Sequence, residues 1–217
     1  MTFCSTWVFV LPGDNDLNDC PNHDRGEAMW NKYFDRPDAT WGRKRHGLSV
    51  TRWGALDESF SFAHRGVLYL GLNMVGGRPY SDREKRERHA EHLRQARRLL
   101  GRARVDDDVA VVVLLAHARP RSYHDDFFEG EEGFVSLVRQ LGKPVVHLHG
   151  DDHYWDEDDG AFGLKNYVRI SLDGESKAPP IEVEIDVGRP NPVRVSRRRR
   201  NLRVQCCGNG WPNGEEV

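Results

Sequence analysis

The run VAVVVLLA, residues 109–116, is apolar from end to end, and this restricts the chain to a small set of folds. A strand of this kind is covered on both faces, as happens in parallel sheets that carry helices. The segments TWVFVL (6–11), GVLYLGLN (66–73) and PVVHLHG (144–150) are short apolar runs of the same type. We therefore expect four buried strands from this part of the chain.

Two helical patterns lie between these runs. Residues 81–101, SDREKRERHAEHLRQARRLLG, place Ser81 at the N-cap and Glu84 three residues later, which is the spacing of a capping box. Gly101 predicts the end of this helix, and one stripe of it is apolar: Ala90, Leu93, Ala96 and Leu100. GFVSLVRQLGK (133–143) predicts a second, shorter helix. The order strand, helix, strand, helix, strand predicts an α/β layered core.

The periodicity changes in the later part of the chain. The segments YVRISL (167–172) and IEVEIDV (181–187) alternate apolar and polar residues, so each predicts a strand with one face in water. Residues 20–62 are rich in Trp, Asp, Arg and Gly and show little periodicity, which predicts irregular structure.

Charge and composition exclude several classes of partner. The 217 residues carry a net charge of −2 and no basic field that favours nucleic acid or an anionic membrane. No apolar run is long enough to span a bilayer, and no secretory leader opens the chain; its localisation stays open. The block Arg197–Arg200 lacks aromatic neighbours, which favours solvated surface. The cysteines lack the paired spacing of a zinc ribbon: Cys4, Cys20, Cys206 and Cys207.

Polar residues able to bind metal follow three of the predicted strands. In open α/β sheets, ligands bind just outside the carboxyl ends of the strands. Carboxylate, amide and imidazole groups at three such ends predict a single divalent-metal site built from loops. The residues are Asp14 and Asn15 after the first strand, His117 after the third, and His149, Asp151, Asp152 and His153 at the fourth.

Each of these pieces also has a simpler interpretation. Aspartates after Pro12 and Gly13 are common turn residues, because Asp and Asn bond to their own backbone. A lone strand-end histidine such as His117 is more often a structural residue than a ligand. The segment DDHYWDEDD (151–159) also fits a solvated acidic loop. Only the shared placement of the three groups favours the metal site.

Taken together, the motifs PGDND (12–16), GVLYLGLNMVGG (66–77), LLAHARP (114–120) and VVHLHGDDHYW (145–155) resemble the calcineurin-like metallophosphoesterase superfamily. The branch that it resembles writes its later motifs as Pro-Gly-Asp-Asn-Glu, a lone His, and His-Gly-Asp-x-His. The resemblance covers residues 5–187 and implies a partial domain with a layered β-sandwich flanked by helices. The remaining residues, 188–217, form a polar, arginine-rich tail.

The resemblance implies a role for each matching residue. Asp14 falls where a metal-ligating Asn usually stands, and Asn15 falls where the catalytic His stands, from which an amide can only hydrogen-bond the phosphate. His117 matches the lone histidine ligand, and His149 is a reserve ligand. The implied metal ligands are Asp14, His117, Asp151, His153 and His149, and the implied catalytic residues are Asn15 and His153.

The family's first two motifs, Asp-x-His and Gly-Asp-x-x-Asp, have no counterpart in this sequence. We therefore expect an incomplete or weakly active hydrolase of phosphate esters that lacks its first strands and self-associates through exposed sheet edges. An intact site of this kind binds two divalent ions, and its mixed ligands suit Mn, Fe or Zn. The alternative is a non-catalytic relative that acts as a binding or interaction protein.

Overall fold

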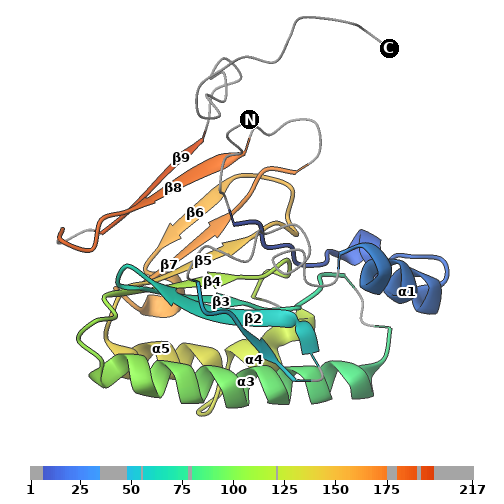
Figure 1. The fold of residues 1–217 in the computed structure, drawn as a ribbon, viewed down its shortest axis with the longest axis horizontal. Helices are drawn as coiled ribbons and strands as arrows, with labels where there is room; N and C mark the ends of the chain where they lie inside the picture. The colour runs from blue at the N-terminus through green and yellow to red at the C-terminus, as the bar shows by residue number, and fades with distance from the viewer. Residues whose placement is uncertain are drawn as a thin grey trace, which may run out of the picture.

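A seven-stranded mixed sheet forms the centre of this α/β protein (Figure 1). The computed structural model describes residues 7–34, 48–54, 56–77, 80–120, 122–174, 180–189 and 192–197. The strand order is β1-β2-β3-β4-β5-β7-β6. The strands are β1 Thr51–Trp53, β2 Leu56–His64, β3 Val67–Gly71, β4 Val111–Leu115, β5 Val145–His149, β6 Asp156–Asp159 and β7 Tyr167–Ser171.

The four central strands, β3, β4, β5 and β7, pair in parallel, while β1, β2 and β6 join the sheet in antiparallel pairs. Parallel strands place their carboxyl ends at one edge, so the loops that follow β3, β4 and β5 meet there. The apolar runs predicted as strands at 66–73, 109–116 and 144–150 contain β3, β4 and β5, which confirms these three expectations.

Three helices cover one face of the sheet: α3 Asp82–Val105, α4 Asp125–Phe128 and α5 Phe134–Leu141 (Figure 1). The hydroxyl of Ser81 accepts the backbone N–H of Glu84, so the predicted cap is present. The helix does not end at Gly101 as expected. The ammonium of Lys143 donates to the carbonyl of Ala103 in the last turn of α3 and to the carbonyls of Asp106 and Val109 beyond it, so it satisfies a carbonyl that the last turn leaves free.

A two-stranded sheet, β8 Ile181–Ile185 and β9 Val193–Arg197, lies over the other face (Figure 1). Ile185 and Val193 pack against a small apolar cluster of β3 and β4 that contains Val67, Val111 and Val113. Burial alternates along β8, as its sequence predicts. β9 falls inside the segment that was expected to be a tail, and residues 198–217 lie outside the described part of the chain.

The N-terminal apolar run does not form the predicted strand, because residues 7–11 carry no strand in the structure. Instead, the ring of Phe9 stacks on the rings of Phe60 and Phe62 of β2, at centroid distances of 4.6 and 4.7 Å. Aromatic stacking on the sheet thus takes the place of ladder hydrogen bonds. The apolar strand edge on which self-association was expected is therefore not formed by these residues.

The region expected to be irregular, residues 20–62, contains helix α1 His23–Tyr33 as well as β1 and most of β2. The sequence of α1 is polar and includes Gly26. That glycine lies against the preceding turn, since a Cβ there would lie 2.6 Å from the carbonyl oxygen of Asp16 and 3.2 Å from Sγ of Cys20. Helix α1 was not predicted because close packing of this kind leaves no periodic pattern in the sequence.

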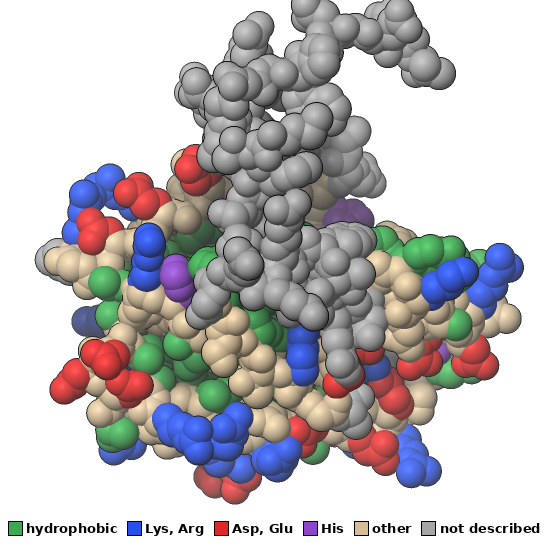
Figure 2. Space-filling model, in the orientation of Figure 1, with side chains coloured by type: hydrophobic (Ala, Val, Ile, Leu, Met, Phe, Trp, Pro, Cys, Tyr) green, Lys and Arg blue, Asp and Glu red, His purple; other side chains and the backbone are tan. Residues whose placement is uncertain are grey.

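The surface carries both signs of charge, and Figure 2 shows acidic and basic side chains interspersed over the face in view. The edge strand β6 consists of four acidic residues, DEDD. Charged edges of this kind oppose pairing with another strand. Among the described residues, no helix combines the length and apolar character that crossing a bilayer demands.

Candidate metal centre

Asp14, His117 and Asp151 come together at the carboxyl edge of the parallel strands. One potential ligand atom from each lies within 4.8 Å of the other two. Oδ1 of Asp14 lies 3.6 Å from Nε2 of His117, and Oδ1 of Asp151 lies 3.9 Å from Nδ1 of the same ring. The structure therefore brings together three of the five metal ligands that the sequence predicted.

Sheet register places His117 beside Asp151. β4 and β5 are parallel neighbours, and Leu115 of β4 is aligned with Leu148 of β5. Just past these strands, the carbonyl of His117 accepts the backbone N–H groups of both Gly150 and Asp151, each at 3.1 Å. These two bonds tie the loops together, so the positions of the two side chains follow from the sheet itself.

Asp14 belongs to the short 3-10 turn η1, Asp14–Asp16, which closes on itself. The backbone N–H of Gly13 donates to Oδ2 of Asp16 at 2.9 Å, and the N–H of Asp16 donates to the carbonyl of Gly13 at 3.2 Å. The amide of Asn18 donates to the carbonyl of Gly76 at 2.8 Å, which holds this turn against the loop after β3. The turn therefore has a defined position even though it lies outside the sheet.

Gly76 takes part in the centre through its backbone, whereas the sequence indicated it only as part of the motif GVLYLGLNMVGG. Its N–H donates to Nδ1 of His117 at 3.1 Å. A Cβ at this position would lie 2.1 Å from Oδ1 of Asp151 and 2.9 Å from Nδ1 of His117. Only glycine leaves room for both side chains. The Gly76-Gly77 pair after the strand is the sequence feature that could have indicated this close approach.

The donor set fits a divalent cation. Two carboxylates flank one imidazole, and the three side chains are 16–19% exposed, so the negative charge of the carboxylates is only partly hydrated. Ligands of one zinc-like ion lie at ~2.0–2.2 Å from it, so a small contraction of the observed spacing would suffice. Because Nδ1 accepts from Gly76, a neutral ring carries its proton on Nε2. Binding an ion at Nε2 requires that proton to leave, and a ring that stays neutral then carries its proton on Nδ1 and loses the hydrogen bond from Gly76.

His149, the reserve ligand, lies apart from this group. It is 1% exposed, and its Nε2 lies 3.1 Å from Nη1 of Arg169. Burial lowers the pKa of His149 to about 4, and the positive charge of Arg169 adds to this effect. A neutral ring beside a guanidinium is a structural arrangement, and the structure gives it no contact with Asp14 or Asp151.

The two residues implied as catalytic also lie outside the three-ligand group. His153 is exposed with a φ of 58°, and its ring packs over the backbone of Gly174, where a Cβ would lie 2.7 Å from the ring's Cγ. Asn15 is exposed, and its backbone N–H donates to Oδ1 of Asp14 at 2.9 Å. The neighbouring Asp152 forms an ion pair with Arg119.

A second polar group, which sequence reasoning missed, is buried under the sheet among the helices. Nδ1 of His89 lies 2.7 Å from Oδ1 of Asp126, and its Nε2 lies 3.1 Å from Nδ1 of His124. His92 lies 2.9 Å from the hydroxyl of Ser59. Burial lowers the pKa of His89 and His92, and lowers that of His124 to about 4. The helix pattern HAEHL concealed these contacts because histidine also suits an exposed helix face.

Comparison with known proteins assigns no family. No protein-family model matches the sequence, and no curated protein matches it. Among solved structures, an enoyl-CoA hydratase from Geobacillus kaustophilus HTA426 has 9% sequence identity and a TM-score of 0.28. This match covers 54% of each chain, so the present chain spans about half the length of that structure. A likeness this distant carries no conclusion about activity.

Proposed function

We propose that this chain is a metal-dependent hydrolase of the calcineurin-like phosphoesterase type, acting on phosphate esters. The observation that supports this proposal is the convergence of Asp14, His117 and Asp151 from three separate loops. These residues match three motifs of the resemblance in order along the chain. The two-stranded sheet over the second face supports the layered sandwich that the resemblance implies.

In this proposal, Asp14, His117 and Asp151 hold a divalent ion such as Mn, Fe or Zn. A bound ion of this type polarises a phosphate ester and lowers the pKa of a bound water. The backbone N–H of Gly76 keeps the His117 ring oriented between the two carboxylates until an ion binds. The exposed amide of Asn15, next to Asp14 in sequence, donates to a phosphate oxygen in this proposal.

A second candidate function, metal or ligand binding without catalysis, is favoured by a specific observation. Within the described residues, the group that could hold an ion has three ligands, whereas a two-metal clamp holds its ions ~3.5–4 Å apart with ligands on both sides. Asn15 also offers no titratable proton for a leaving group. We therefore propose slow or no turnover for these 217 residues, with weak binding of a single ion.

The test measures Mn binding by calorimetry and hydrolysis of phenyl phosphate in the same samples. We expect saturable Mn binding that His117→Ala weakens, and turnover below ~1 per second. Asp107→Asn removes an exposed carboxylate far from the centre and serves as the control. Mn-dependent turnover lost in His117→Ala supports the hydrolase, and Mn binding without turnover supports the binding protein. Equal Mn affinity in His117→Ala and the control contradicts both.

A further inference from the structure

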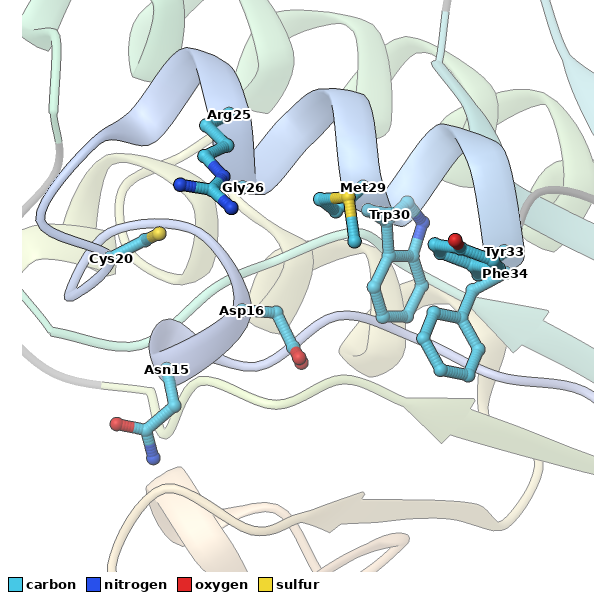
Figure 3. Close-up of a pocket in the computed structure, with 9 residues that line it drawn as sticks. All are labelled: Asn15, Asp16, Cys20, Arg25, Gly26, Met29, Trp30, Tyr33 and Phe34. Atoms are coloured by element: carbon cyan, nitrogen blue, oxygen red, sulfur yellow. The ribbon is translucent and has the colours of Figure 1, made fainter.

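A pocket of about 290 Å³ opens between the η1 turn and helix α1 (Figure 3). Asn15 and Asp16 of η1 line one side, and residues of α1 line the other. Asp14, the ligand on this side of the centre, belongs to the same three-residue turn. The pocket and the centre are therefore held at a set spacing by one short structural element.

The α1 side of this pocket is aromatic. Trp30 and Phe34 lie one helical turn apart with ring centroids 5.2 Å from each other, and Tyr33 and Met29 line the pocket beside them. Figure 3 shows Met29, Trp30 and Phe34 projecting from α1 toward the η1 side. Trp30 is anchored because it is 5% exposed and belongs to a small apolar cluster with Leu17 and Val75.

Three of these apolar side chains are partly open to solvent. Met29 is 44% exposed, Tyr33 51% and Phe34 39%. Neighbouring large apolar groups that stay accessible around a hollow are characteristic of a binding surface, because burying them against a ligand is favourable. The rim is polar: Asp16 and Arg25 line the same pocket. Arg25 adds a positive charge to this rim, and it forms no ion pair within the part of the chain that is described here.

We propose that this pocket receives the leaving group of the phosphate ester and that this group carries a planar aromatic ring, as in an aryl or nucleoside phosphate. The inference rests on the proposed function. Hydrolysis breaks the bond between phosphorus and the leaving-group oxygen; water supplies the new P–O bond and the proton that the leaving oxygen takes. The phosphate lies at Asp14, the ring packs against Tyr33 and Phe34, and Arg25 attracts the anionic ester.

The size and chemistry of the pocket favour this occupant. Flat rings gain most from aromatic walls, because offset stacking adds to the burial of apolar surface. The polar edges offered by Asn15, Asp16 and Arg25 suit a ring that bears donors and acceptors. An alkyl leaving group neither stacks on aromatic side chains nor offers the donors and acceptors of a heterocyclic ring. A second copy of this chain is the competing occupant, since exposed apolar side chains also drive dimer formation.

The experiment compares Tyr33→Ala with Tyr123→Ala, which removes a tyrosine of similar exposure (51% and 48%) from η2, Ser122–His124. Calorimetry with Mn measures binding of adenosine 5′-monophosphate, phenyl phosphate and glycerol phosphate to each protein. We expect Tyr33→Ala to weaken the two aromatic esters roughly fivefold or more and to leave glycerol phosphate unchanged. The control should bind all three normally. Loss for adenosine monophosphate alone identifies the nucleoside class, and loss for both aromatic esters the wider aryl class.

A second measurement separates this inference from the proposed function. Saturation-transfer NMR with adenosine, in EDTA, reports contact with the pocket without metal or phosphate, and Met29→Ala should reduce that signal as Tyr33→Ala does. Adenosine contact without Mn binding would uphold the pocket and reject the metal centre. Equal losses for all three esters, or none, overturn the aromatic subsite. So does a dimer that Tyr33→Ala dissociates without changing ester binding.

Discussion

Oδ1 of Asp14 lies 3.6 Å from Nε2 of His117, although one residue follows the N-terminal run and the other follows the central strand β4. The second nitrogen of the same ring faces Gly76 and Asp151. The His117 ring thus lies close to residues of three other segments: Asp14, Gly76 and Asp151. Its two carboxylate neighbours repel each other, and a bound cation would relieve that repulsion.

Removing either partner of this pair should weaken metal binding. We expect Asp14→Ala and His117→Ala each to lower Mn affinity at least about tenfold, because each substitution removes one of only three ligands. Calorimetry measures the affinity. Asp107→Asn, which changes the same net charge at an exposed turn, should leave it unchanged. A tenfold loss in that control as well would show that net charge, rather than coordination, governs binding.

Gly76→Ala should damage the centre and the fold together. The added methyl group would lie 2.1 Å from Oδ1 of Asp151, so one of the two must move. We expect the free energy of unfolding to fall by about 1–3 kcal/mol, as for other overpacked sites, with loss of Mn binding. Urea denaturation and calorimetry measure the two effects.

Gly101→Ala provides the matched control for this substitution. Gly101 lies inside α3, and a Cβ there meets nothing within 4 Å. Alanine in a helix interior is favoured over glycine by about 0.5–1 kcal/mol. The same glycine-to-alanine change should therefore stabilise the protein at Gly101 and destabilise it at Gly76. If both substitutions stabilise the protein, or both destabilise it, steric contact with Asp151 does not explain the effect of Gly76→Ala.

Mild acid should destabilise the protein. Burial lowers the pKa of several histidines below the ordinary value of 6.5: His89, His92, His124, His147 and His149. For His124 and His149 the folded pKa is about 4, so between pH ~6.5 and ~4 the unfolded chain binds protons that the folded chain does not. The free energy of unfolding should therefore fall as pH falls through this window.

The measurement is urea denaturation at about pH 7.5, 6 and 5, within the linkage window. A histidine whose pKa falls from 6.5 to about 4 on folding lowers the free energy of unfolding by at most about 3 kcal/mol when the pH falls below both values, at 1.36 kcal/mol per unit of pKa. A free energy of unfolding that stays constant from about pH 7.5 to 5 would contradict neutral burial of these rings.

Lys143 should contribute more to stability than an ordinary exposed lysine does. Its ammonium donates to three carbonyls at 2.7 Å each, those of Ala103, Asp106 and Val109. Lys143→Met removes these charged hydrogen bonds, and we expect a loss of about 2–3 kcal/mol. Lys165→Met, at an exposed lysine, should change stability by less than about 0.5 kcal/mol. Thermal or urea unfolding of both variants checks the difference.

Local pattern was enough to predict most of the central architecture. The apolar runs around Val67, Val111 and Val145 became parallel strands, because residues covered on both faces of a sheet leave a continuous signal in sequence. The cap at Ser81 was predictable because it involves neighbours three residues apart. The strand-end positions of His117 and Asp151 followed from the same strands.

Other features arise from contacts between residues that are distant along the chain, and no periodicity encodes these. Phe9, in a segment that carries no strand, stacks on Phe60 and Phe62 of β2. Helix α3 continues past Gly101 to Val105, and the distant Lys143 donates to the carbonyl of Ala103 in its last turn.

The candidate centre, too, was predictable from the sequence only in part. Residue type and strand order were sufficient to place His117 and Asp151 at one edge as candidate ligands, because strand ends in a parallel sheet share one edge. Asp14 was placed there from a predicted strand that the structure does not form. Only the folded chain shows that His149 faces Arg169 and that His153 packs over Gly174. Only the folded chain, too, places the N–H of Gly76 on the His117 ring. Side-chain direction and close backbone approach depend on packing in three dimensions, and that packing is set by residues far away in sequence.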